Sequence, residues 1–368
     1  MSPIWDKCGN CLCAIAANTP CWHYLCMAND VHAKDEAIGR APGATGHLFW
    51  TAGEAGVDPH WGHGAGGTPT GRTLRPTDRL TCEATALGTA AKSVFVGCGN
   101  PERVLVAGDV HGNLSWAKTL VKLADRHQCQ GIVQLGDFGY WSHTPEGERF
   151  LDNTERALAH YNLWLVFIPG NHENHELLRR NVLGADGFYH LRDHLAAAPF
   201  GARWSWRGVA FGALGGAFSI DYQRREPGTD WWPGLEEPGR EDAARLGGAP
   251  LDVLLSHDAP AGARGLDAVG HVVATEAALR TRVLLAEVVK GLRPSLVLHG
   301  HWHHRNSTTL SWVDPELTGA EGALTWSETV VEGLAADIQG DTRAWGVLCL
   351  DGPGSFRFVP GNIAERDL

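Results

Sequence analysis

The sequence of 368 residues contains no continuous apolar run near the roughly 18–20 residues that a membrane-spanning helix needs. It also has no convincing secretory signal, because the apolar run at residues 12–17 is short and Asp6 precedes it. We therefore expect no membrane partner and a cytoplasmic, reducing location. In such a compartment the nine cysteines are more often thiols or metal ligands than disulfides.

Positive charge is scarce. The chain carries 31 Lys and Arg against 42 Asp and Glu, for a formal net charge of -11. This argues against broad electrostatic attraction to duplex nucleic acid or to anionic lipid. Bound metal ions can still hold an anionic substrate, so nucleic acid stays a candidate substrate that is not favoured. The hydrophobic fraction of 43% is that of a globular protein with a substantial core.

Residues 1–100 lack the alternating and helical apolar patterns of a folded domain. Cys8 and Cys11 have the two-residue gap of a zinc knuckle, and Cys21 and Cys26, with His23, could complete a structural zinc site. The paired spacing is not repeated, so an irregular or disordered extension is the alternative, as is a later start of translation. We expect an extension over residues 1–100 and a folded domain over 101–360.

From residue 102 onward, strand and helix patterns alternate with short connections, which predicts right-handed crossovers and a largely parallel sheet. After residue 187 the pattern becomes strand-rich. Two sheets packed face to face with helices outside fit this order. We predict that Ser115 caps the first helix. The predicted strands are 103–107, 131–135, 163–168, 188–191, 203–206, 209–214, 252–255, 295–298, 306–313 and 345–350; the predicted helices are 115–129, 146–161, 173–182 and 276–290, and residues 216–250 are expected to be loop.

Five of the apolar runs end in side chains that bind metal ions. Seven oxygen and nitrogen donors without cysteine suit Zn, Mn or Fe at a hydrolytic site. They are too many for one catalytic ion with an open position. They fit two ions that share a bridging carboxylate, roughly 3.5–4 Å apart. The candidate ligands are Asp109, His111, Asp137, Asn171, His257, His301 and His303.

Each of these motifs is weak when taken alone. A single Asp-x-His or Gly-Asp is ordinarily a turn, and a His-x-His at a strand end is ordinarily a solvated edge. All five occur in chain order, each after an apolar run, and turn chemistry does not explain that combination.

As a set, the motifs resemble the five signature blocks of the calcineurin-like metallophosphoesterase superfamily, over about residues 103–313. The resemblance implies an α/β fold, a four-layer α/β/β/α sandwich of two mixed sheets flanked by helices, with a dinuclear centre at the sheet edges. The matching blocks are Gly108-Asp-Val-His-Gly112, Gly136-Asp137, Gly170-Asn-His-Glu173, His257 and Gly300-His-Trp-His303.

The resemblance also implies roles by position. A hydroxide bridging the ions would attack phosphorus, and His172 would donate a proton or hydrogen bond to the leaving oxygen. Glu173 would orient an imidazole of the site. The implied ligand sets are Asp109, His111 and His303 for one ion, Asn171, His257 and His301 for the other, and Asp137 as the bridge.

Two stretches refine the expected substrate. The second block continues as Phe-Gly-Tyr-Trp141, without the Asp-Arg of the Ser/Thr protein phosphatases, which argues against a phosphoprotein. Residues 215–232 resemble small bacterial and phage phosphoesterases. There Arg224 or Arg225 could clamp phosphate and Trp231 could stack on a base or sugar. The alternative for this stretch is a packed aromatic lid with surface arginines.

We therefore expect a metal-dependent phosphoesterase acting on a phosphomonoester or phosphodiester, with a small or nucleotide-like substrate. One alternative is a metal-dependent nuclease or nucleotide-processing enzyme. Another is a non-catalytic scaffold of the same fold, against which stand the complete ligand set and the presence of His172.

Overall fold

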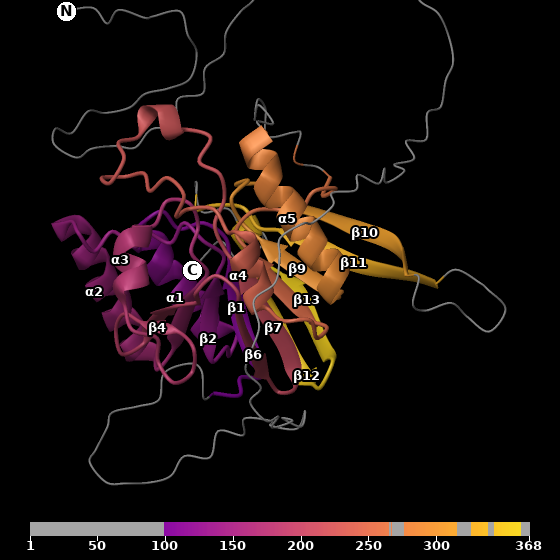
Figure 1. Ribbon diagram of the computed structural model, residues 1–368. Helices are drawn as coiled ribbons and strands as arrows, with labels where there is room; N and C mark the ends of the chain where they lie inside the picture. The colour runs from indigo at the N-terminus through magenta and orange to yellow at the C-terminus, as the bar shows by residue number, and fades with distance from the viewer. Residues whose placement is uncertain (1–98, 265, 267–275, 315–324, 338–341, 362–368) are drawn as a thin grey trace, which may run out of the picture. The chain divides into compact units, whose positions relative to one another are not determined.

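The computed structural model describes most of the chain after residue 98 (Figure 1). The predicted extension at 1–100, apart from its last two residues, and the candidate zinc ligands Cys8, Cys11, Cys21 and Cys26 lie outside the described residues. The described ranges are 99–264, 266, 276–314, 325–337 and 342–361.

One sheet has seven strands in the order β13-β12-β1-β2-β3-β5-β4. β1, β2, β3 and β5 run parallel, and the outer strands pair antiparallel with their neighbours. The strands are β1 (Arg103–Ala107), β2 (Gly131–Gln134), β3 (Trp164–Phe167), β4 (Tyr189–His190), β5 (Leu195–Ala197), β12 (Trp345–Gly352) and β13 (Ser355–Pro360).

The other sheet has six strands in the order β10-β11-β9-β8-β7-β6. β7, β8, β9 and β11 are parallel, while β6 and β10 form antiparallel edges. The strands are β6 (Ala202–Trp206), β7 (Val209–Leu214), β8 (Val253–Ser256), β9 (Leu296–His299), β10 (Asn306–Asp314) and β11 (Thr325–Gly333).

The two sheets face each other and helices cover their outer faces (Figure 1). In β1, Val104 and Val106 point into the core between the sheets, whereas Leu105 and Ala107 point toward the helices of the first sheet. This alternation follows from the two-residue period of a strand. The predicted four-layer α/β/β/α architecture is confirmed. The helices are α1 (Leu114–Arg126), α2 (Pro145–Tyr161), α3 (His175–Arg180), α4 (Arg240–Arg245) and α5 (Glu276–Leu292).

Helix α1 begins one residue before the predicted start, and Ser115 is not its cap. The side chain of Asn113 accepts a hydrogen bond from the backbone N–H of Trp116 at 3.1 Å and so takes the N-cap position. Asn113 follows Gly112, whose φ of +68° turns the chain out of β1. An amide side chain with extended backbone at that point satisfies a helix N–H that would otherwise be unpaired.

Several elements differ from the sequence prediction. β5 is only three residues long, too short for a periodic signal, and β13 is an exposed edge strand. β11 was not predicted, and the region 216–250 contains the 3-10 turn η2 (Tyr222–Arg224) and α4 as well as loop. Among the described residues, no helix is long and apolar enough to cross a membrane.

Candidate metal centre

The predicted ligands follow the carboxyl ends of parallel strands. Asp109, Asp137 and Asn171 come after β1, β2 and β3, which are neighbours in the seven-stranded sheet. His257 and the pair His301 and His303 come after β8 and β9, which are neighbours in the six-stranded sheet. Because parallel strands end at the same edge, both sheets deliver donor side chains to one end of the sandwich.

The donors form two groups. Asp109, His111 and His303 offer ligand atoms that all lie within 4.8 Å of one another. Asp137, His257 and His301 form a second group within the same limit. Within the first group, His303 Nε2 lies 3.0 Å from Asp109 Oδ2.

Asp137 lies between the groups. Its Oδ2 is 3.6 Å from Nε2 of His111 in the first group and 3.4 Å from Nε2 of His257 in its own group. Asn171 joins the second group, since its Oδ1 is 3.1 Å from His257 Nε2. The structure thus brings all seven predicted ligands together.

The backbone around these side chains is unusual. Four of the seven have positive φ, a conformation that residues other than glycine rarely adopt and that concentrates at functional sites. These tight turns point the side chains into the site, whereas a regular continuation of the strand would point them elsewhere. The four are His111 at 48°, Asp137 at 54°, His301 at 65° and His303 at 52°.

One buried oxygen indicates what the site is built to hold. Asp109 Oδ2 is buried and makes no well-aligned hydrogen bond, although Nε2 of His303, itself a candidate ligand, lies 3.0 Å away. Its other oxygen accepts the backbone N–H of His301 at 2.9 Å. A cation between the carboxylate oxygen and the imidazole nitrogen would satisfy both buried polar atoms. With carboxylate, amide and imidazole donors around it, the site fits divalent metal ions.

A family model described as calcineurin-like phosphoesterase matches residues 102–305. The chain belongs to the calcineurin-like phosphoesterase family. Among solved structures, a protein from Thermus thermophilus is 17% identical, with 71% of this chain and 99% of that chain covered and a TM-score of 0.40. A dimetal phosphatase from Danio rerio is 14% identical, with 71% and 100% covered and a TM-score of 0.40. No curated protein matches. The assignment rests on the family model.

Glycines let the loops around the two donor groups approach each other. A Cβ on Gly170 would lie 2.2 Å from Asp137 Oδ1 and 2.3 Å from its backbone N. A Cβ on Gly300 would lie 2.3 Å from Asp109 Oδ1, and one on Gly136 would lie 2.2 Å from His257 Nδ1. Each of these three glycines therefore leaves the space that a ligand side chain occupies.

Gly170→Ala is expected to lower kcat/KM by about a hundredfold, because a displacement of about 1 Å at a catalytic group costs that much. The added methyl would push Asp137 out of its place between the two groups. Hydrolysis kinetics and metal content measured on the same preparation check this. Gly291→Ala in α5 is the matched control, since its Cβ would meet nothing within 4 Å. Wild-type turnover by Gly170→Ala would show that the close approach is not needed.

The charges of the donor side chains set one another's pKa values. Burial disfavours the charged imidazole of His257, but the Asp137 carboxylate, with help from Asp109, raises the pKa of His257 to about 10. Burial and the neighbouring His257 lower the pKa of His301 to about 3. Burial opposes ionisation of Asp137, yet the imidazoles of His257 and His172 hold its pKa well below the usual value. The Asp137 carboxylate therefore stays charged, as a carboxylate that binds a metal ion must.

His172 borders the site without belonging to either group. Its backbone N–H donates to Asp137 Oδ1 at 2.8 Å, and its ring centroid lies 6.2 Å from that of His111. Burial and the positive charge of Arg225 lower the pKa of the His172 imidazole, against the Asp137 carboxylate, which raises it. The ring is therefore neutral at pH 7 and offers an N–H.

Glu173 is fully buried and contacts backbone, which revises the expectation that it orients an imidazole. Its carboxylate accepts backbone N–H groups from Gly170, Gly139 at 3.1 Å and Asp137 at 3.3 Å. It therefore joins the loops after β2 and β3. Burial and the Asp137 charge raise the pKa of Glu173 to about 7, although the N–H bonds oppose that shift.

The carboxylate that does contact a ligand imidazole was not predicted. Asp337 Oδ1 lies 3.3 Å from His111 Nδ1, and Oδ2 accepts the side-chain amide of Asn113 at 2.8 Å. Carboxylates in this position fix the ring orientation and tautomer of a ligand histidine. The sequence does contain a signal for Asp337, because this residue follows an apolar run after β11 as the ligands follow theirs. Asp337 belongs to none of the five blocks, however.

The predicted substrate residues divide into two kinds. The side chain of Arg225 is 4% exposed and pairs with Glu236 at 3.3 Å, and it also donates to Ser219 Oγ. Its charge is therefore already paired within the protein. Arg224 is exposed, and Trp231 is half-buried with its ring 5.4 Å from that of Tyr222.

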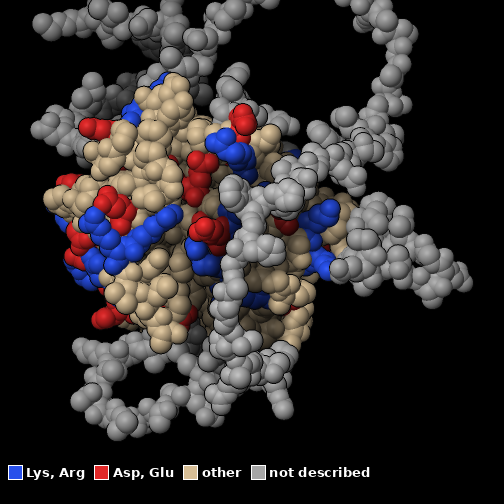
Figure 2. All heavy atoms as spheres, in the orientation of Figure 1, with Lys and Arg blue, Asp and Glu red and all other residues tan. Residues whose placement is uncertain are grey.

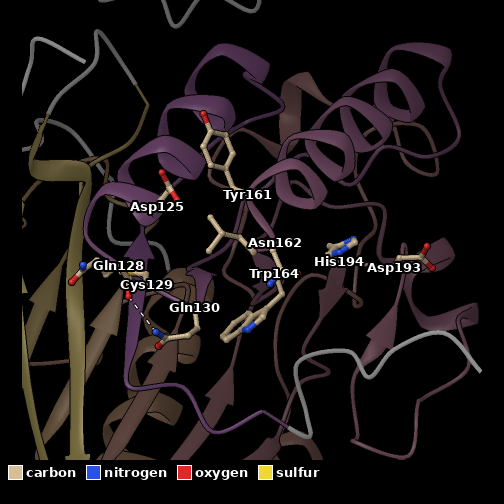
Figure 3. A pocket seen from close by; sticks show the side chains of 10 residues that line it. Asp125, Gln128, Cys129, Gln130, Tyr161, Asn162, Trp164, Asp193 and His194 are labelled. Atoms are coloured by element: carbon tan, nitrogen blue, oxygen red, sulfur yellow. Dashed lines mark hydrogen bonds between the residues drawn. The ribbon is translucent and has the colours of Figure 1, made fainter.

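A hollow of about 610 Å³ lies away from the metal ligands (Figure 3). Its lining includes Gln130 and Trp164, near the amino ends of β2 and β3, whereas the ligands follow the carboxyl ends. It also includes Asp125 and Tyr161, at the ends of α1 and α2. The hollow therefore does not take part in the metal centre.

Proposed function

We propose that this chain is a metal-dependent phosphoesterase that hydrolyses a phosphomonoester or phosphodiester at a dinuclear centre. The observation that carries the proposal is the place of Asp137, whose Oδ2 faces an imidazole nitrogen of each donor group at 3.6 and 3.4 Å. One carboxylate shared by two ligand sets is the arrangement of two-metal hydrolases.

The two groups define the proposed ligand sets. Asp137 would be the ligand shared by the two ions, and Asp337 and the backbone contacts of Glu173 hold the proposed ligands in place. The proposed sets are Asp109, His111 and His303 for the first ion, and Asn171, His257 and His301 for the second.

When bound, two such ions supply an activated nucleophile, which we propose to be a shared hydroxide, and positive charge for the phosphate oxygens. Residues of the chain hold the reacting groups in position. Asp137 is held by the backbone N–H of His172 on one oxygen, which leaves Oδ2 facing both groups. The neutral His172 imidazole donates its N–H to the oxygen that leaves phosphorus. We further propose that residues 101–360 form the catalytic domain and that residues 1–100 are an extension to it.

Metal reconstitution tests the proposal directly. The full chain, stripped and then loaded with Mn, Zn or Fe, is expected to bind about two ions per chain. Loading is expected to restore hydrolysis of at least one ester in a panel of phosphomonoesters, phosphodiesters and single-stranded DNA. Elemental analysis and product release measure the two quantities. Less than one ion per chain with no hydrolysis would instead identify a non-catalytic scaffold, and cleavage of DNA alone would identify a nuclease.

A further inference from the structure

The segment 217–236, which follows β7, docks against the metal centre. Ser219 Oγ accepts the side-chain N–H of Asn171 at 3.1 Å, and Arg225 donates to the Asn171 carbonyl at 3.4 Å. The charges of Asp221 and Arg225 both act on the His172 imidazole. The segment therefore borders the site on the side of Asn171 and His172. Figure 1 shows it as the loop drawn above α3.

Buried polar contacts hold the segment from inside. Arg225 and Glu236 are 4% and 3% exposed and pair with each other. Glu236 also accepts the backbone N–H of Trp232 at 2.9 Å and the hydroxyl of Ser219. A charge that is buried and paired in this way does not reach a substrate, so Arg225 fixes the segment and leaves phosphate binding to the metal centre.

The segment also carries a row of aromatic rings. The ring of Tyr222 lies 5.7 Å from that of Phe218 and 5.4 Å from that of Trp231, and all three residues are half-buried. Ile220, between them in sequence, is 47% exposed. Figure 2 shows a tan, uncharged patch at the upper left of the molecule, bordered by charged side chains.

None of these four residues packs into the three apolar cores of the described chain. Their apolar surface therefore does not serve the fold, as far as the described residues show. A partly exposed apolar cluster beside a catalytic site is typical of a ligand contact.

We propose that Phe218, Tyr222 and Trp231 form a subsite that binds a planar aromatic group carried by the phosphate ester. This inference rests on the proposed phosphoesterase function and adds a substrate class to it. Flat rings stack on flat rings in offset or edge-to-face geometry, and the contact tolerates many ring types. Arg225 does not contribute a charge to this subsite, because it is paired with Glu236 and Asp221.

The test compares two esters with the same ten-carbon ring skeleton, one flat and aromatic and the other saturated. Both 2-naphthylmethyl phosphate and decahydro-2-naphthylmethyl phosphate release a primary alcohol, so the leaving oxygen is closely matched. The metal-loaded full chain is expected to hydrolyse the aromatic ester with a kcat/KM about tenfold higher, from stacking. In Trp231→Leu and Tyr222→Leu this ratio is expected to fall to about one. Tyr161→Leu, in α2 at the hollow, is the control and should keep the wild-type ratio.

A wild-type ratio near one, or a ratio that neither Leu substitution changes, would overturn the subsite. Failure of the proposed function gives a different result, namely no hydrolysis of either ester by the metal-loaded wild type. In that case the corresponding phosphonates decide by calorimetry. Tighter binding of 2-naphthylmethylphosphonate that is lost in Trp231→Leu supports the subsite, and equal binding of the two phosphonates by the wild type refutes it.

Discussion

Asp137→Asn is expected to lower kcat/KM by about a thousandfold and to reduce the metal content below two ions per chain. In the structure Oδ1 accepts the N–H of His172, and Oδ2 faces His111 and His257. An amide has only one oxygen and cannot serve both positions. Its NH₂ would either oppose the His172 N–H or point at the shared metal position, and the negative charge is lost in both cases.

Elemental analysis and hydrolysis kinetics of the purified variant check this prediction. Asp193→Asn makes the same chemical change at an exposed residue of the hollow and is the matched control. Two ions per chain together with wild-type turnover in Asp137→Asn would contradict the bridging role.

His172→Ala is expected to separate catalysis from metal binding. The residue belongs to neither donor group, so metal content should stay at the wild-type level while kcat falls by about a hundredfold or more. The loss should be larger for an alkyl ester than for a 4-nitrophenyl ester, because a poor leaving group depends more on the N–H donated to its oxygen. The two esters measured with one preparation give this difference.

His304→Ala is the control, since His304 is half-buried beside the last block and lies outside both groups. Loss of bound metal in His172→Ala, or an equal loss of rate for both esters, would show that His172 supports the site instead of the leaving oxygen.

The convergence of the candidate ligands could be predicted because it depends on a simple rule. A parallel strand is a short apolar run, and the residues just beyond its carboxyl end meet those of its neighbours. Asp109, Asp137 and His257 each follow such a run, so their convergence could be expected from the sequence alone. The same rule supports the two-sheet architecture, which the structure confirms.

Other parts of the site depend on contacts between segments far apart in the chain. Asp337 lies 226 residues from His111, and no local pattern identifies it as the partner of that imidazole. Arg225 was a candidate phosphate clamp because sequence does not reveal that Glu236 pairs with it. Glu173 was expected to contact an imidazole ring, but its carboxylate accepts backbone N–H groups from the loop after β2 instead. Short β5 carries too few residues for any periodic signal.

The division of the ligands between the two sheets has a consequence for folding. Asp109 and His111 follow a strand of one sheet, while their partner His303 follows a strand of the other. In the second group, Asp137 and His257 are divided in the same way. An ion bound to either group would therefore cross-link the two sheets, so that ion affinity and the free energy that holds the sheets together would be thermodynamically linked. Substitutions deep in the core between the sheets will therefore change metal affinity without touching a ligand.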